Sequence, residues 1–122
     1  MIKNFEEITE ELNEKEMALI PHIVAGLLRN TSPTKPSKAP YIVSSFNRFF
    51  EGKGLAKLTE PRFRKCVNFI RKNGLIPLIA TSDGYFVSYD IEIIESQILS
   101  LQQRARSIND CAKGLEKFTK PK

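Results

Sequence analysis

The sequence predicts a mainly helical α+β protein, and three features of the chain support this prediction. Four segments place apolar residues at helical spacing. Two short segments rich in β-forming residues flank a turn signal at residues 82–84, and prolines and glycines separate the segments. A chain of 122 residues is long enough to bury one core. We expect a polar N-terminal arm at 1–11, a domain at 12–89 and a long C-terminal helix at 90–119.

The first predicted helix covers residues 12–29, and Asn13 is its candidate N-cap. Pro21 lies inside this run, so the sequence leaves open a kink or a start nearer Pro21. Residues 30–40 contain three prolines, which exclude regular structure and mark a loop. The apolar residues of the helix at roughly helical spacing are Leu12, Met17, Ile20, Val24, Leu27 and Leu28.

A second helix is predicted at 37–51. Ser37 is its candidate cap, and Pro40 falls in the first turn, where a missing N–H is tolerated. Residues 52–58, with two glycines, form a turn into the next helix. The residues predicted on the inner face of this helix are Tyr41, Ile42, Ser45, Phe46, Phe49 and Phe50.

The third helix is contained in residues 57–72, KLTEPRFRKCVNFIRK. Thr59 is a good N-cap, and Glu60 and Pro61 are suited to the first turn. Apolar residues then recur at i, i+3, i+4 and i+7, which predicts one buried face. These residues are Phe63, Cys66, Val67 and Ile70.

The other side of this helix is basic. At about 100° per residue, Lys65, Asn68 and Lys72 point away from the apolar stripe. Three arginines, Arg62, Arg64 and Arg71, lie on the flanks. A helix that is cationic outside and anchored by apolar residues inside fits a DNA major groove. The alternative is an ordinary solvated surface helix.

Two predicted strands follow, at 75–81 and 85–88, on either side of Ser82-Asp83-Gly84. The Asp-Gly pair is a strong signal for a hairpin turn. Pro77 cannot donate to a sheet ladder, so the first strand is predicted at an edge or only partly paired.

A long final helix is predicted after Asp90, its candidate N-cap, and reaches toward Phe118. Its apolar residues follow a heptad pattern, which predicts a coiled coil and a homodimer through residues 91–115. The alternative is an amphipathic helix that folds back across the first helix. The a and d positions are Ile91, Ile94, Ile98, Leu101, Ala105, Ile108, Ala112 and Leu115.

The positive charge is concentrated in the middle of the chain. Residues 17–72 carry eleven Lys or Arg against two glutamates, a net charge of +9, as a polyanionic partner requires. The two cysteines match no zinc or redox spacing, and a single histidine, His22, is predicted to be structural. Without a signal-peptide pattern or a membrane-length apolar run, the sequence predicts a cytoplasmic protein.

Two supporting helices, a basic helix and a β-hairpin follow one another in the order of a winged helix-turn-helix domain. The run at 57–88 resembles small winged-helix proteins of phage and prophage origin. They carry an LT-x-x-R-x-R-K-x-[IV]-N-x-IR helix and an S-x-GY wing. The match is loose over 12–118 and detailed over 57–89, and it implies a fold more firmly than a task. Asp83 replaces the basic wing tip of many such proteins. The matching residues are Leu58, Thr59, Arg62, Arg64, Lys65, Val67, Asn68, Ile70, Arg71, Ser82, Gly84 and Tyr85.

The sequence therefore predicts a protein that binds double-stranded DNA as a transcriptional or replication accessory factor of a mobile element. Arg64, Lys65 and Asn68 are expected at base edges. The alternative is a non-catalytic adaptor whose last helix binds a protein partner, and RNA binding is a weaker third hypothesis. No catalytic constellation, cofactor motif or metal spacing is present in the sequence, so we expect neither an enzyme nor a cofactor. The residues expected at phosphates are Lys57, Arg62, Arg71 and Lys72, with Lys38 or Arg48 as further candidates, and Thr59 completes the predicted DNA-binding residues.

Overall fold

The computed structural model describes residues 11–119 as a mainly helical α+β protein with four helices and one two-stranded antiparallel sheet. The chain divides into two compact units, with the division between Ser88 and Tyr89. Apart from Glu11, the predicted N-terminal arm lies outside the described residues. The elements are α1 (Glu14–Asn30), α2 (Ala39–Phe50), α3 (Glu60–Lys72), β1 (Leu78–Thr81), β2 (Gly84–Val87) and α4 (Ile91–Glu116).

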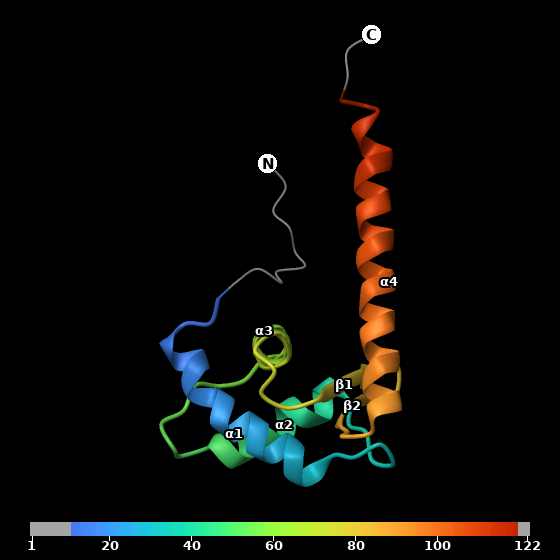
Figure 1. Cartoon of the computed structure of the whole chain (residues 1–122). Coiled ribbons are helices and arrows are strands. Elements are labelled where there is room, and N and C mark those ends of the chain that lie inside the picture. Colours follow the sequence, from blue (N-terminus) through green and yellow to red (C-terminus); the bar gives the residue numbers. More distant parts are fainter. Residues whose placement is uncertain (1–10, 120–122) are drawn as a thin grey trace. The chain divides into compact units, whose positions relative to one another are not determined.

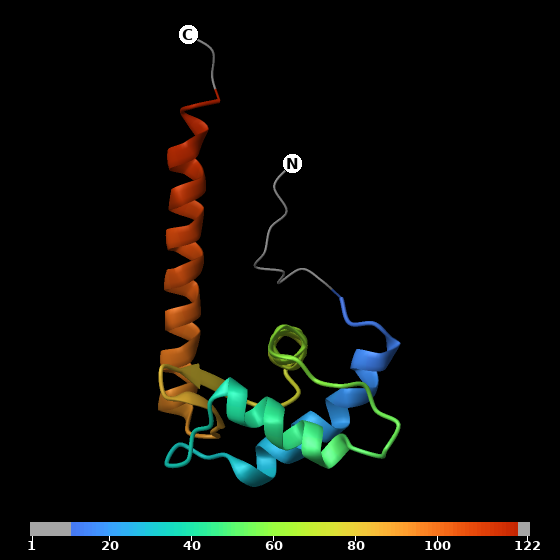
Figure 2. The ribbon, with the colours of Figure 1, turned by 180° about the vertical axis from the view of Figure 1, so that it is seen from behind.

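Within the first unit, α3 packs on both α1 and α2, and the hairpin closes the same core. Both views show α3 along its axis while α1 and α2 run across the picture, so α3 crosses the other two helices steeply (Figures 1 and 2). This crossing gathers apolar residues from every element of the unit. The buried residues at the centre are Leu19, Ile23, Leu27, Ile42, Phe50, Leu58, Phe63, Cys66, Ile70, Leu78 and Val87.

Helix α1 begins as predicted at Asn13, but it runs without interruption through Pro21 to Asn30. Buried residues lie on both sides of the proline, and their packing holds the two parts of the helix together although Pro21 donates no backbone hydrogen bond. The predicted apolar stripe was partly wrong, because Met17 and Leu28 are exposed. The stripe that faces the core consists of Leu19, Ile20, Ile23 and Leu27.

The predicted start of α2 at Ser37 is also wrong, since the helix begins at Ala39 and Lys38 occupies the N-cap position without a side-chain hydrogen bond. Ser37 is instead in an extended bridge with β2. Its N–H donates to the Tyr85 carbonyl at 2.9 Å, and the Tyr85 N–H donates to the Ser37 carbonyl at 2.7 Å. A residue paired in this way cannot cap the helix. The proline-rich loop therefore contains bridge residues at Ser32, Lys35 and Ser37, although the sequence predicted no regular structure there.

The hairpin is shorter than predicted. β1 begins after Pro77, and the pairs run from Leu78 with Val87 to Thr81 with Gly84. Ser82 and Asp83 form the turn, whereas Gly84 opens β2 at φ 125°. A Cβ atom at Gly84 would lie 2.5 Å from the Ser37 carbonyl oxygen, so the bridge to the loop requires glycine there.

The second unit consists mainly of α4. The Asp90 side chain accepts a hydrogen bond from the Glu92 N–H at 2.9 Å, which confirms the predicted N-cap. None of the 26 residues of α4 is buried, and several a and d side chains are largely exposed, with Ile108 at 70%. The apolar stripe of this helix is therefore not buried within the second unit.

Candidate nucleic-acid interface

Helix α3 has the orientation that its sequence pattern predicts. Thr59 caps it, because its hydroxyl oxygen accepts a hydrogen bond from the Arg62 N–H at 3.2 Å. The Phe63 ring is buried and meets the Tyr85 ring edge-on, with 5.2 Å between the ring centroids. The predicted apolar stripe is confirmed, and it faces the core. The basic residues of α3 are consequently directed to the other sides of the helix. The buried residues of α3 are Phe63, Cys66, Val67 and Ile70.

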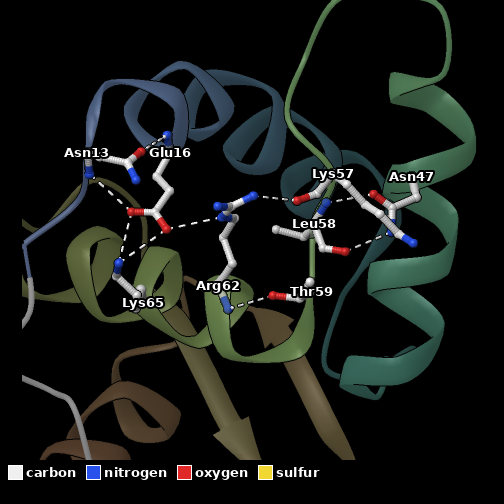
Figure 3. A network of polar contacts seen from close by, with 8 residues as sticks. All are labelled: Asn13, Glu16, Asn47, Lys57, Leu58, Thr59, Arg62 and Lys65. Carbon is white, nitrogen blue, oxygen red and sulfur yellow. Dashed lines mark hydrogen bonds and ion pairs between the residues drawn. The ribbon is translucent and has the colours of Figure 1, made fainter.

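Two of these basic residues are held by a carboxylate from α1. Glu16 is only 3% exposed, and Figure 3 shows it between the two side chains. Its Oε2 accepts a hydrogen bond from Arg62 Nε at 3.1 Å, and Lys65 Nζ lies 2.9 Å from Oε1 and 3.1 Å from Oε2. The Arg62 and Lys65 side chains are 29% and 17% exposed. One of their two positive charges is therefore compensated inside the protein.

Glu16 is also fixed by the start of its own helix. The Glu16 N–H donates to Asn13 Oδ1 at 2.8 Å, and the Asn13 N–H donates to Glu16 Oε1 at 3.0 Å. This reciprocal pair is a capping box, which satisfies two backbone donors at the helix start. One carboxylate thus joins the beginning of α1 to the middle of α3.

The charge of Glu16 is stabilised by these partners. Burial raises the pKa of the carboxyl group, but the hydrogen bonds from the Asn13 backbone, Lys65 and Arg62 outweigh burial and hold the pKa below its usual value. Glu16 is therefore ionised at neutral pH. Protonating Glu16 therefore requires a more acidic solution than an ordinary glutamate needs.

The same charge affects the thiol beneath it. Burial, with a further contribution from the negative charge of Glu16, raises the pKa of Cys66 to about 11, although Arg62 and Lys65 oppose this effect. The thiolate is the reactive form of cysteine, so Cys66 is unreactive near neutral pH. Cys66 is a packing residue of α3, whereas Cys111 on α4 is exposed.

The turn before α3 is fixed by two side chains. Asn47 on α2 donates from Nδ2 to the Leu58 carbonyl at 2.8 Å, and its Oδ1 accepts from the Leu58 N–H at 2.7 Å. Arg62 Nη1 donates to the Lys57 carbonyl at 2.7 Å (Figure 3). The start of α3 is therefore held against both α1 and α2, and its position depends on Arg62.

The structure places the predicted site residues in two groups. Arg62 and Lys65 form ion pairs with Glu16, so the geometry does not favour the DNA contacts that the sequence predicted for them. The other residues lie elsewhere on the surface around α3 or its preceding turn. Lys57, Thr59, Arg64 and Lys72 are exposed, whereas Asn68 and Arg71 are half-buried. The further candidates Lys38 and Arg48 are both exposed, at the start and in the last turn of α2.

The two groups correspond to two flanks of one helix. With about 100° per residue, Arg62 and Lys65 fall on the side of α3 that Glu16 covers. Arg64 and Arg71 fall on the opposite flank, with Asn68 between that flank and the outermost line and Lys72 close to that line. The basic face of α3 is therefore divided by a single carboxylate into a side engaged with α1 and a second side.

The sequence patterns assigned no role to Glu16. A signal was present, because Asn13 and Glu16 have the spacing of a capping box. That spacing predicts a local hydrogen bond. It contains no information about Arg62 or Lys65, which lie 46 and 49 residues away in the sequence.

Within residues 11–119 no helix is long and apolar enough to cross a membrane. The same part of the chain holds no cluster of three or more His, Cys, Asp or Glu that could bind a metal ion. No family model matches the chain, and no significant match was found among curated proteins or solved structures.

Proposed function

We propose that this chain is a winged helix-turn-helix protein that binds double-stranded DNA through α3, as a transcriptional or replication accessory factor of a mobile element. The element order supports the fold, since two helices precede the basic helix and a hairpin follows it. The bridge between Ser37 and Tyr85 adds support, because it joins the loop after α1 to the hairpin as a winged-helix sheet does. The hairpin is then the wing.

The division of the α3 surface is the observation that carries the proposal in its detailed form. One flank supports the helix through Glu16, and outside that flank Arg64 and Lys72 are exposed. Arg64 and Asn68 are assigned to base edges, since arginine pairs with guanine and asparagine with adenine in the major groove. Lys72 and Arg71 are assigned to phosphates, with Lys57 and Thr59 at the start of the helix.

Arg62 and Lys65 receive a different role from the one that the sequence alone predicted. Both are positioning residues, because their ion pairs with Glu16 fix the rotation of α3 against α1. Arg62 also donates a hydrogen bond to the Lys57 carbonyl, which fixes the turn that leads into the helix. The side chains that contact DNA depend on this orientation, because base recognition requires the reading helix to be rigid.

We assign α4 to dimerisation with a second copy of the chain. The exposed a and d residues form a heptad seam, and a two-stranded coiled coil would bury it. A dimer would present two copies of α3 to two half-sites about 34–36 Å apart. Two linked readers gain affinity through effective concentration, which compensates for the few base pairs that one helix can contact.

The salt dependence of DNA binding tests the proposal. With about four phosphates contacted per subunit, log affinity should fall against log salt with a slope of about −3 to −4 per subunit. Lys72→Ala should make this slope shallower by about one unit, equally on all duplexes. Fluorescence anisotropy with a labelled random-sequence duplex measures both quantities.

A charge-neutral double variant provides the control. Lys65→Ala with Glu16→Gln removes both ion pairs of Glu16 without changing the net charge, so the slope should stay within about half a unit of the unmodified value. If this variant loses as much slope as Lys72→Ala, Lys65 contacts phosphate and the division of α3 is wrong. A chain that binds no duplex at low salt would contradict DNA binding altogether and favour the protein adaptor.

A further inference from the structure

A groove in the first unit has no role in DNA binding as proposed. It lies between α1 and α2, on the part of the surface formed by the loop after α1, and its volume is about 570 Å³. Ligand sites for small molecules commonly have volumes of roughly 300–1,000 Å³. The groove therefore has the size of a small-molecule site. A groove of this size is too small for a protein partner, because a stable protein interface buries about 800 Å² on each side.

The bottom of the groove depends on Gly26. A Cβ atom at this position would lie 2.6 Å from two atoms of the Phe46 ring, closer than side chains approach one another. The absence of a side chain at Gly26 thus allows the Phe46 ring to lie directly against α1. Glycine is unfavourable inside a helix by about 1 kcal/mol. The close approach of the Phe46 ring explains why glycine occupies this position in α1.

The groove has an aromatic wall. Phe46 stacks on the buried Phe50 with 5.6 Å between ring centroids, and Phe49 contacts the His22 ring with centroids 6.1 Å apart. The Phe49 side chain is about half exposed, and the Tyr41 side chain at the start of α2 is largely exposed. The sequence predicted both rings on the inner face of α2, and the structure corrects this. The exposed Tyr41 ring can pack on a planar apolar group, whereas the Phe49 ring already has Lys53 Nζ 4.5 Å from its centroid.

The charged residues of the groove are all basic. Arg29 from the last turn of α1 and Lys35 from the loop both line it, and no aspartate or glutamate is among its lining residues. Hydroxyl groups of Ser45 and Tyr41 lie along the same surface. An apolar groove with convergent polar groups and cations of one sign is complementary to a ligand with a ring and a negative charge.

The loop side of the groove is held in place by the hairpin. Thr31 Oγ1 accepts a hydrogen bond from the Val87 N–H at 3.0 Å and donates to the Leu27 carbonyl at 2.8 Å. Ser37, at the other end of the loop, is bridged to Tyr85. A groove whose walls are hydrogen-bonded in advance needs little reordering to accept a ligand.

We propose that this groove binds a small aromatic carboxylate. The ring of the ligand lies on the Phe46 and Tyr41 side chains, and its carboxylate meets Arg29 and Lys35. This assignment follows from the lining of the groove alone, so it does not depend on whether α3 binds DNA. A basic rim favours the carboxylate over an amine of the same shape, because the amine would be repelled.

Titration with two probes of equal shape tests the proposal. In amide NMR spectra of the full chain, 2-naphthoate should shift the signals of Gly26, Ser45 and Phe46 and bind with a dissociation constant near or below about 1 mM. 2-Naphthylmethylammonium should bind at least about tenfold more weakly, because its charge is of the wrong sign. Equal binding of the two probes, or naphthoate shifts confined to other residues, would overturn the proposal.

Charge reversal sharpens the result. Arg29→Glu with Lys35→Glu should invert the preference, so that the ammonium probe binds more tightly than naphthoate. The matched control, Arg106→Glu with Lys113→Glu on α4, makes the same change in net charge at residues that do not line the groove and should retain the original preference. Circular dichroism establishes that each variant is folded. If both double variants respond alike, net charge attracts the probe and the groove does not bind it.

Discussion

Helices α3 and α4 both carry a regular apolar stripe, but only the stripe of α3 is buried within its own unit. In α3 the stripe is fully covered, and Phe63, Cys66 and Ile70 have no exposed surface. In α4 no residue is buried, and Ile108 is 70% exposed. The difference does not come from the length of the stripe, because the stripe of α4 is the longer one.

The comparison shows what an amphipathic pattern can and cannot predict. Apolar periodicity indicates that one face of a helix gains stability by leaving water. It does not indicate which surface covers that face. For α3 the cover is α1, α2 and the hairpin of the same chain. For α4 we propose a second copy. Substitutions in both helices and in the carboxylate that holds α3 test this contrast.

The largest effect is expected from Phe63→Ala. Removing a fully buried ring should lower the free energy of unfolding by about 3–5 kcal/mol, because it removes apolar burial and leaves a cavity. The loss should not depend on protein concentration, since the cover comes from the same chain. Ile108→Ala should cost little at low concentration and more as dimers form. Urea denaturation at several concentrations distinguishes the two. Equal, concentration-independent losses would mean that α4 is covered within its own chain.

Assembly is the next test. Leu101→Glu with Ile108→Glu places two charges on the d positions of the seam, and the variant should sediment as a monomer while the unmodified chain sediments as a dimer. Ser100→Glu with Ser107→Glu adds the same charges at c positions outside the seam, so this control should remain dimeric. An unmodified chain that is monomeric at high micromolar concentration would show that the dimer proposal is wrong.

Glu16 should have an intermediate effect. Glu16→Ala should cost about 2–4 kcal/mol, because it removes the capping box and leaves two cations without their partner. Glu16→Gln keeps the hydrogen bond to Asn13 and should cost less, about 1–2 kcal/mol. Thermal denaturation at neutral pH measures both losses.

The difference in stability between the unmodified chain and the Glu16→Gln variant should depend on pH in one direction. Because the pKa of Glu16 is lowered in the folded state, its stabilisation is complete above the unfolded pKa of about 4.3 and is lost as pH falls through the folded value. The unmodified chain should therefore lose its advantage over Glu16→Gln in strong acid. An advantage that persists unchanged at about pH 2, or that grows in acid, would mean that the carboxylate charge is not what binds α1 to α3.

The two cysteines give the smallest but most direct comparison of the helices. Cys111 on the exposed α4 should react with a thiol reagent in the native protein, whereas Cys66 should react only after unfolding. Near neutral pH the native chain should thus show one reactive thiol, and the denatured chain two. The raised pKa of Cys66, about 11, supports this difference because almost no thiolate is present at neutral pH. Rapid native labelling of both thiols would mean that α3 opens readily.

Local features of the fold could be predicted because they depend on neighbouring residues. Asn13, Thr59 and Asp90 cap the helices that follow them, as their side chains indicate. The apolar stripe of α3 was predicted residue by residue for the same reason, because helical spacing places these side chains on one face. The predicted basic face is also local in origin.

Features that depend on distant residues could not be read from the chain. Ser37 has the character of a helix cap, but its backbone pairs with Tyr85, and this bridge moves the start of α2 and determines where Gly84 must lie. Glu16 has the character of a surface residue, but α3 covers it and supplies two cations. The sequence by itself therefore determined which helices form and which faces are apolar or basic. Only the tertiary structure decided which cations are already paired, because ion pairs and backbone bridges join residues that are far apart in the sequence.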